Sequence, residues 1–311
     1  MDGKQLRTQY KEHLSDFNNW NQKEHAEDFI LYPKNIGYHL CIDETALSKG
    51  ELYTILTNRD KHGRKGTIVA IVKGTKAEDV INVLLKIDAD KRNQVKEITL
   101  DMAGSMQKIA KRCFPGAMQV VDRFHVSKLV YEAVQDLRIA YRWQVMKDEN
   151  RKIKEAKAKG ESYEPKVFGN GDTLRQLLAR SRYLLFKAPD KWQQSQKVRA
   201  KLLFEQFPDI KSVYYYALRL GKIFSDYTDK DVARAKLALW YNEIEEFGYD
   251  TFTTVANSIE NHYERILNYF VNRSTNAAAE AFNAKIKAFR ASFRGVVDKR
   301  FFLYRLAKVY A

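Results

Sequence analysis

Three acidic residues stand at positions suited to metal-dependent chemistry on phosphate groups. Asp43 and Asp101 follow the apolar runs LCI and ITL, a pattern that predicts that each ends a buried strand. Glu280 lies in an alanine-rich stretch, about 200° around a helix from Phe282. Phe282 and Ile286 belong to an apolar stripe with helical spacing, so Glu280 faces away from the packing side. We therefore treat the three carboxylates as one candidate site.

Carboxylates without His or Cys partners favour hard cations such as Mg²⁺ or Mn²⁺, which prefer oxygen ligands. Two such ions, about 3.5–4 Å apart, activate an attacking oxygen and stabilise the leaving oxygen in phosphoryl transfer. We predict that Asp43, Asp101 and Glu280 are catalytic residues that hold two ions. The alternatives are hydrogen-bonded turn residues for the aspartates and a solvated side chain for Glu280.

Three more residues are candidates for auxiliary roles. Asp122 and His125, in the run VVDRFHV, could position a phosphate, shuttle a proton or support the metal site. The alternative is a buried histidine that is hydrogen-bonded to the aspartate for structural reasons. Asn283 lies three residues after Glu280, so the two side chains share one face of the predicted helix.

The charge balance indicates a polyanionic partner. The chain has 54 Lys and Arg against 39 Asp and Glu, a net charge of +15, and 13% aromatic residues on which bases could stack. A basic protein without such a partner is the alternative. The basic residues that we predict to contact DNA are Lys285, Lys287, Arg290, Arg294 and Arg300 near the C-terminus and Lys152, Lys154 and Lys157 in mid-chain. The alternative is that these clusters form solvated helix faces without a DNA-binding role.

Several classes of protein are disfavoured by the sequence. The two cysteines, Cys41 and Cys113, form no CxxC pair, so neither a zinc finger nor a disulfide framework is expected. The charged N-terminus lacks the apolar segment of a secretory signal, and no apolar run reaches membrane-spanning length. We expect no membrane partner and a reducing cytoplasmic location.

An α/β class is predicted by the order of the elements. Strands are expected at 38–45, 51–58, 67–74, 95–102 and 117–126, and helices at 76–88 and 103–114. This order, βββαβαβ, matches the mixed sheet of the ribonuclease H-like fold.

After residue 127 only helices are predicted until the end of the chain. We expect them at 128–159, 173–187, 189–207, 208–225, 229–248, 251–271, 275–293 and 298–310. The predicted organisation is therefore a lead-in segment at 1–36, the first part of the core at 37–126, an all-helical insertion at 127–270 and core helices at 271–311.

Four segments resemble the DDE transposases of bacterial insertion sequences, most closely the ISL-three group. They are IDETALSKGELYTILTN, ITLDMAGSMQKIA, VVDRFHV and STNAAAEAFNAKIKAF. The resemblance covers roughly residues 36–310. It implies that Asp43, Asp101 and Glu280 are the catalytic trio and that Asp122 and His125 match a recurrent Asp-x-x-His motif. It also implies a helical insertion before the last catalytic helix.

The implied activity is metal-dependent cleavage at transposon ends, followed by attack of the freed 3′-OH on target DNA. The implied partners are double-stranded DNA and further copies of the chain assembled on it, in the bacterial nucleoid. Residues 1–36 contain no Cys for the zinc module of related proteins, so we expect a separate or frameshift-joined protein to recognise the ends. Two alternatives remain, a structure-specific nuclease and a non-catalytic DNA-binding protein derived from a transposase.

Overall fold

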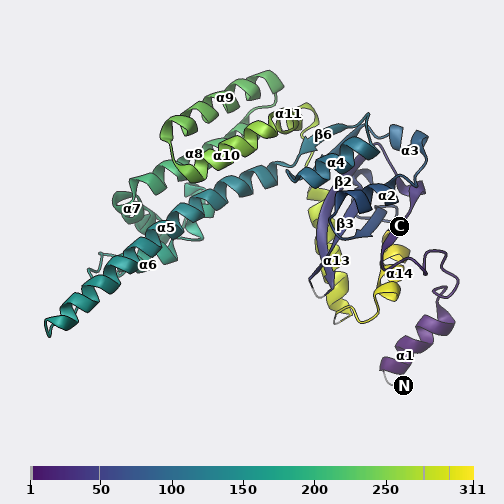
Figure 1. Ribbon diagram of the computed structural model, residues 1–311, viewed down its shortest axis with the longest axis horizontal. Helices are drawn as coiled ribbons and strands as arrows, with labels where there is room; N and C mark the ends of the chain where they lie inside the picture. The colour runs from purple at the N-terminus through teal and green to yellow at the C-terminus, as the bar shows by residue number, and fades with distance from the viewer. Residues whose placement is uncertain (1–2, 49, 276, 294) are drawn as a thin grey trace. The chain divides into compact units, whose positions relative to one another are not determined.

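The computed structural model describes residues 3–48, 50–275, 277–293 and 295–311. The chain divides into two compact units, residues 1–122 with 264–311 and residues 123–263 (Figure 1). The first unit contains a six-stranded mixed sheet, and the second is built from helices. The predicted α/β class is therefore confirmed. Within the described ranges, no helix has both the length and the apolarity needed to cross a membrane.

The sheet of the first unit has the strand order β1-β4-β3-β2-β5-β6. Its strands are β1 (Phe29–Leu31), β2 (His39–Ser48), β3 (Glu51–Asn58), β4 (Ile68–Lys73), β5 (Glu97–Leu100) and β6 (Met118–Val121). β1 pairs with β4, β4 with β3, and β3 with β2, all in antiparallel orientation. Short connections join β2 to β3 and β3 to β4, as is common for antiparallel neighbours. β2, β5 and β6 pair in parallel, and helices connect them along the chain.

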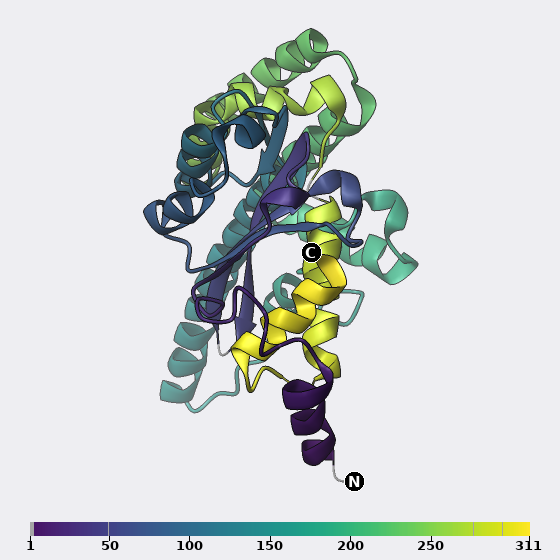
Figure 2. The ribbon, with the colours of Figure 1, turned by 90° about the vertical axis from the view of Figure 1, so that its right-hand side faces the viewer.

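Helices cover both faces of this sheet (Figure 2). α2 (Ala77–Leu84) and α4 (Gly104–Cys113) pack on one face, where Leu40 and Ile42 belong to the core. α13 (Ala277–Ser292) and α14 (Lys299–Tyr310) pack on the other face, against Ile55 and Ile68. A small helix, α3 (Ala89–Asn93), precedes β5. A sheet covered on both faces needs apolar side chains on both, which explains the continuous apolar runs of its strands.

The predicted lead-in segment at the N-terminus belongs to the first unit, and it contains a strand of the sheet. It begins with α1 (Gly3–Gln9), and its last part, β1, is an edge strand paired with β4. Phe17 packs edge-on against Phe301 and Tyr304 of α14, with ring centroids 5.2 and 5.4 Å apart. The strand was not predicted because three residues before a proline give too short a pattern.

The second unit begins with a helix of 36 residues, α5 (Arg123–Ala158). The predicted strand 117–126 therefore ends at Val121, and Phe124 and His125 are helical. The other helices of this unit are α6 (Leu174–Arg180), α7 (Gln194–Gln206), α8 (Pro208–Asp226), α9 (Lys230–Phe247) and α10 (Asp250–Asn261). The predicted helix 251–271 is in fact three helices, because α11 (Tyr263–Leu267) and α12 (Tyr269–Asn272) follow α10.

Candidate active site

Asp43 and Asp101 come together because β2 and β5 are parallel neighbours. Cys41 pairs with Thr99, so continuing the register by two residues brings Asp43 beside Asp101. Asp101 directly follows β5, as predicted. Asp43 does not end its strand, since β2 continues to Ser48. Asp43 lies instead at the level where the neighbouring parallel strand β5 ends. The two aspartates therefore lie side by side at the carboxyl end of β5, which forms this edge of the sheet.

Both aspartates make local hydrogen bonds that orient their carboxylates. Oδ1 of Asp101 accepts from the backbone N–H of Ala103 at 2.8 Å, just before α4. Oδ1 of Asp43 accepts from the N–H of Glu44 at 2.8 Å, and its Oδ2 accepts from Nδ2 of Asn283 at 2.7 Å. A carboxylate oxygen has two acceptor positions, so these bonds fix the groups without exhausting their capacity for a cation.

Negative charge accumulates at this edge of the sheet. Burial raises the pKa of Glu44, and the negative charges of Asp101 and Asp43 raise it further. The carboxylates of Asp43, Glu44 and Asp101 are therefore close enough to affect one another electrostatically. A bound cation would relieve their mutual repulsion, which is an arrangement typical of sites for hard metal ions.

Glu280 lies on the helix that packs against β2. Asn283, one turn later on the same face of α13, is the residue that donates to Asp43. The side chain of Glu280 is exposed, on the first turn of the helix. Across the described residues, no three His, Cys, Asp or Glu side chains lie close enough together to hold a metal ion. The structure thus brings the two aspartates together and places Glu280 on the adjoining helix.

The donor chemistry at this edge nevertheless fits Mg²⁺ or Mn²⁺. The candidate ligands are carboxylate oxygens, which hard divalent ions prefer. The local excess of negative charge points the same way, because the carboxylates of Asp101 and Asp43 add to the effect of burial in raising the pKa of Glu44. Asp43 and Asp101 are therefore the candidate ligands that the structure brings together, and Glu280 on the adjoining helix stays a predicted third ligand.

The two members of the predicted Asp-x-x-His motif lie in different units. Asp122 follows β6 in the first unit, where its backbone N–H donates to the carbonyl of Leu100 at 3.0 Å. Its side chain is buried, and it lies one strand beyond Asp101. His125 lies in the first turns of α5, in the second unit.

The predicted DNA contacts divide into two kinds. Nζ of Lys285 donates to the carbonyl of Gly63 at 2.9 Å, and Arg300 pairs with Glu27 at 3.1 Å, so both also hold the first unit together. Lys287 is exposed on α13, and Arg290 is partly exposed. Arg294 lies outside the described residues. Three further lysines, Lys152, Lys154 and Lys157, are exposed on α5.

A buried ion pair that the sequence did not reveal supports the site. Arg59 pairs with Glu97 at 2.7 Å, and Nδ2 of Asn272 donates to the other carboxylate oxygen at 2.9 Å. Burial alone would raise the pKa of Glu97, but hydrogen bonds from Asn272 and Ser274 and the charge of Arg59 lower it below its ordinary value. Asn272 is the last residue of α12, so this network attaches the end of α12 to β5, shortly before α13 begins. A glutamate inside the apolar strand KEITL was the only signal of it.

Comparison with known proteins gives one family. A family model described as a transposase, of the DDE type found in ISL-three insertion sequences, matches residues 40–306. The match covers well over half of the chain and includes Asp43, Asp101 and Glu280. No curated protein and no solved structure gives a significant match.

Proposed function

The chain belongs to the ISL-three family of DDE transposases, and on that premise we propose that it cuts and joins DNA with a ribonuclease H-like core. The proposed substrates are the double-stranded ends of a mobile element and a target DNA. The six-stranded mixed sheet with helices on both faces is compatible with that core. Since two element ends must be handled together, we propose that several copies of the chain act as an assembly on DNA.

The single observation that carries the proposal is the meeting of Asp43 and Asp101 beside α13. Bound Mg²⁺ or Mn²⁺ supplies Lewis acidity and neutralises charge on the transferring phosphate. Asp43 and Asp101 would hold the ions from the sheet, and Glu280 would hold them from α13. Asn283 fixes the orientation of Asp43 through the 2.7 Å hydrogen bond. The basic surface holds the phosphate backbone, which positions DNA without reading its sequence.

The proposed reaction has two phosphoryl transfers. In the first, water attacks a phosphodiester at the element end, the P–O bond to the 3′ oxygen breaks, and a 3′-OH is released. In the second, this 3′-OH attacks a phosphodiester of the target and forms a new P–O bond while the target's own 3′ oxygen leaves. Neither step needs an oxidant or a cofactor beyond the divalent ions.

Substitution of the aspartates tests this function. In Asp43→Asn and Asp101→Asn, metal-dependent nicking of an element-end duplex should fall by about 10²–10⁴-fold, because bound metal ions lower the activation barrier by several kcal/mol. DNA affinity should be unchanged or slightly higher, since each variant loses one negative charge. Asp60→Asn is the matched control, because Asp60 is exposed and pairs with His39.

Gel assays of nicking and of strand transfer into a plasmid separate the alternatives. Nicking that persists in both aspartate variants would refute the site. Nicking without any joined product in the wild-type chain would identify a nuclease, and DNA binding without nicking would identify a non-catalytic DNA-binding protein.

A further inference from the structure

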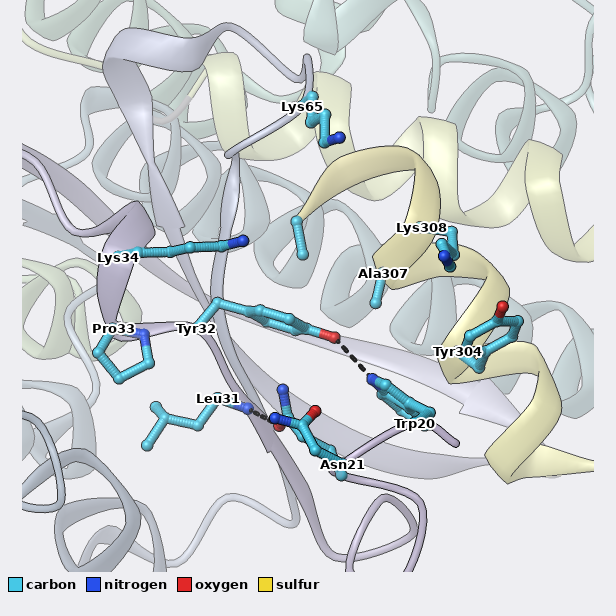
Figure 3. A pocket seen from close by; sticks show the side chains of 12 residues that line it. Trp20, Asn21, Leu31, Tyr32, Pro33, Lys34, Lys65, Tyr304, Ala307 and Lys308 are labelled. Carbon is cyan, nitrogen blue, oxygen red and sulfur yellow. Dashed lines mark hydrogen bonds between the residues drawn. The ribbon is translucent and has the colours of Figure 1, made fainter. Parts of the chain in front are cut away.

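The first unit contains a cavity on the side of the sheet away from β6. It has a volume of about 480 Å³ and lies among the N-terminal segment, the residues that follow β1, and α14 (Figure 3). Cavities of about 300–1,000 Å³ are typical of small-molecule sites. β1 is the edge strand at one end of the strand order and β6 is at the other, so this cavity is distinct from the carboxylates between β2 and β5.

Aromatic side chains form one wall of the cavity. Nε1 of Trp20 donates to the hydroxyl of Tyr32 at 3.3 Å, and the ring of Trp20 meets that of Tyr304 edge-on at 5.5 Å. Figure 3 shows Tyr32, which directly follows β1, reaching toward Trp20, and Tyr304 near Trp20 on α14. Tyr304 is buried and belongs to the cluster that contains Phe17. The wall is therefore held in place before any ligand arrives.

Lysines surround the opening of this cavity. Lys34 and Lys65 line it, and no ion pair engages either of them in the part of the chain that the structure describes. Lys308 also lines it, but its Nζ pairs with Asp16 at 2.8 Å, so its charge is partly neutralised. Two uncompensated ammonium groups beside aromatic rings suit a ligand with both a phosphate and a planar ring.

We propose that this cavity binds one unpaired nucleotide of DNA. The base packs against Tyr32 and Trp20, and Lys34 and Lys65 hold the adjacent phosphate. A paired base is excluded, because its faces are covered by its neighbours in the duplex. This inference rests on the proposed function for the identity of the polymer, and it adds to that function a separate site for single-stranded DNA.

Fluorescence of 2-aminopurine tests the proposal on the full chain. We compare a blunt duplex with the same duplex carrying a four-nucleotide overhang, in which 2-aminopurine replaces one unpaired base. The overhang should bind on the order of tenfold more tightly, with quenched fluorescence as the base stacks. In the double variant Lys34→Ala with Lys65→Ala, that preference and the quenching should be lost. Equal affinity for blunt and overhanging DNA would overturn the proposal, as would quenching unchanged in the double variant.

Two controls keep the outcome interpretable. Lys76→Ala with Lys111→Ala removes two exposed lysines of the same unit outside the cavity and should leave the preference intact. Tyr32→Phe keeps the ring and should keep the quenching. The catalytic variant Asp43→Asn should also quench normally. Loss of nicking with intact quenching therefore concerns only the proposed catalytic site, whereas normal nicking without an overhang preference overturns only the nucleotide site.

Discussion

Asn283 is a side chain of α13 that donates a hydrogen bond to a candidate catalytic carboxylate, that of Asp43. In Asn283→Ala, Asp43 loses the donor that orients it. We expect the nicking rate to fall about 10–100-fold, because hydrogen bonds to charged groups are worth about 1.5–3 kcal/mol. The measurement is single-turnover nicking at saturating DNA, so that a change in binding is excluded.

Asn93→Ala, which removes an exposed amide of the same unit, is the control and should leave the rate unchanged. Asn283→Asp should be slower still, because a second carboxylate beside Asp43 opposes its ionisation. A wild-type rate in Asn283→Ala would show that the bond only packs α13 on the sheet.

The acidic residues could be found from the sequence because burial of a carboxylate in an apolar run is costly and therefore conspicuous. Helical spacing placed Asn283 on the face of Glu280. It did not find that Asn283 bonds to Asp43, since that contact joins residues 240 positions apart. Glu97 gave the same signal as Asp101, but its partner Arg59 lies far away in the sequence, directly after β3, so its role was visible only in the structure.

The network of Arg59, Glu97 and Asn272 ties the end of α12 to β5, shortly before α13 begins. Glu97→Gln removes the counter-charge of Arg59 from a buried ion pair, and we expect a loss of about 3–5 kcal/mol in the free energy of unfolding. Urea unfolding followed by near-ultraviolet circular dichroism measures this loss. Glu78→Gln, at an exposed pair with Lys108, is the control and should change stability little.

The pH dependence of this loss has a definite sign. The folded-state pKa of Glu97 lies below its ordinary value, so its stabilisation is fully present above the unfolded-state pKa. The stabilisation is lost as the pH falls through the folded-state pKa. The stability gap between the wild type and Glu97→Gln should therefore be constant near pH 7 and should shrink below about pH 4.3. A gap independent of pH would show that packing, and not charge, is lost.

Elements with a long apolar period were predicted well, and short or composite ones were not. β3 and α8 match their predicted ranges closely because each has one uninterrupted pattern. β1 was missed because its three residues acquire strand geometry only by pairing with β4. The strand predicted at 117–126 merged β6 with the start of α5, since both are apolar and no glycine or proline separates them.

Both units of the molecule have more basic than acidic residues. Substitutions near the C-terminal end of α5 test whether this positive charge binds DNA. Lys152, Lys154 and Lys157 are exposed there, and none forms an ion pair with another described residue. Replacing all three by Glu should lower DNA affinity. The slope of log affinity against log salt should also become shallower by about 2–3, because each phosphate contact contributes about 0.9.

Fluorescence anisotropy at several salt concentrations measures this slope. The matched control replaces three other exposed lysines of the second unit, Lys191, Lys197 and Lys201, by Glu. An equal change in slope for both triple variants would indicate a general charge effect. No change in the α5 variant would mean that this face is only solvated.

The discontinuous first unit has a consequence for synthesis on the ribosome. The strands are complete once Val121 has been made, but α13 and α14, which cover one face, begin only at Ala277. At a synthesis rate of about 5–20 residues per second, that apolar face stays uncovered for roughly 8–30 s. During this delay the second unit can fold as a whole, while the sheet remains a target for chaperones and for aggregation. Under the proposed function, Glu280 is the last of the three candidate carboxylates to be made, so a nascent chain that already binds DNA cannot yet cut it.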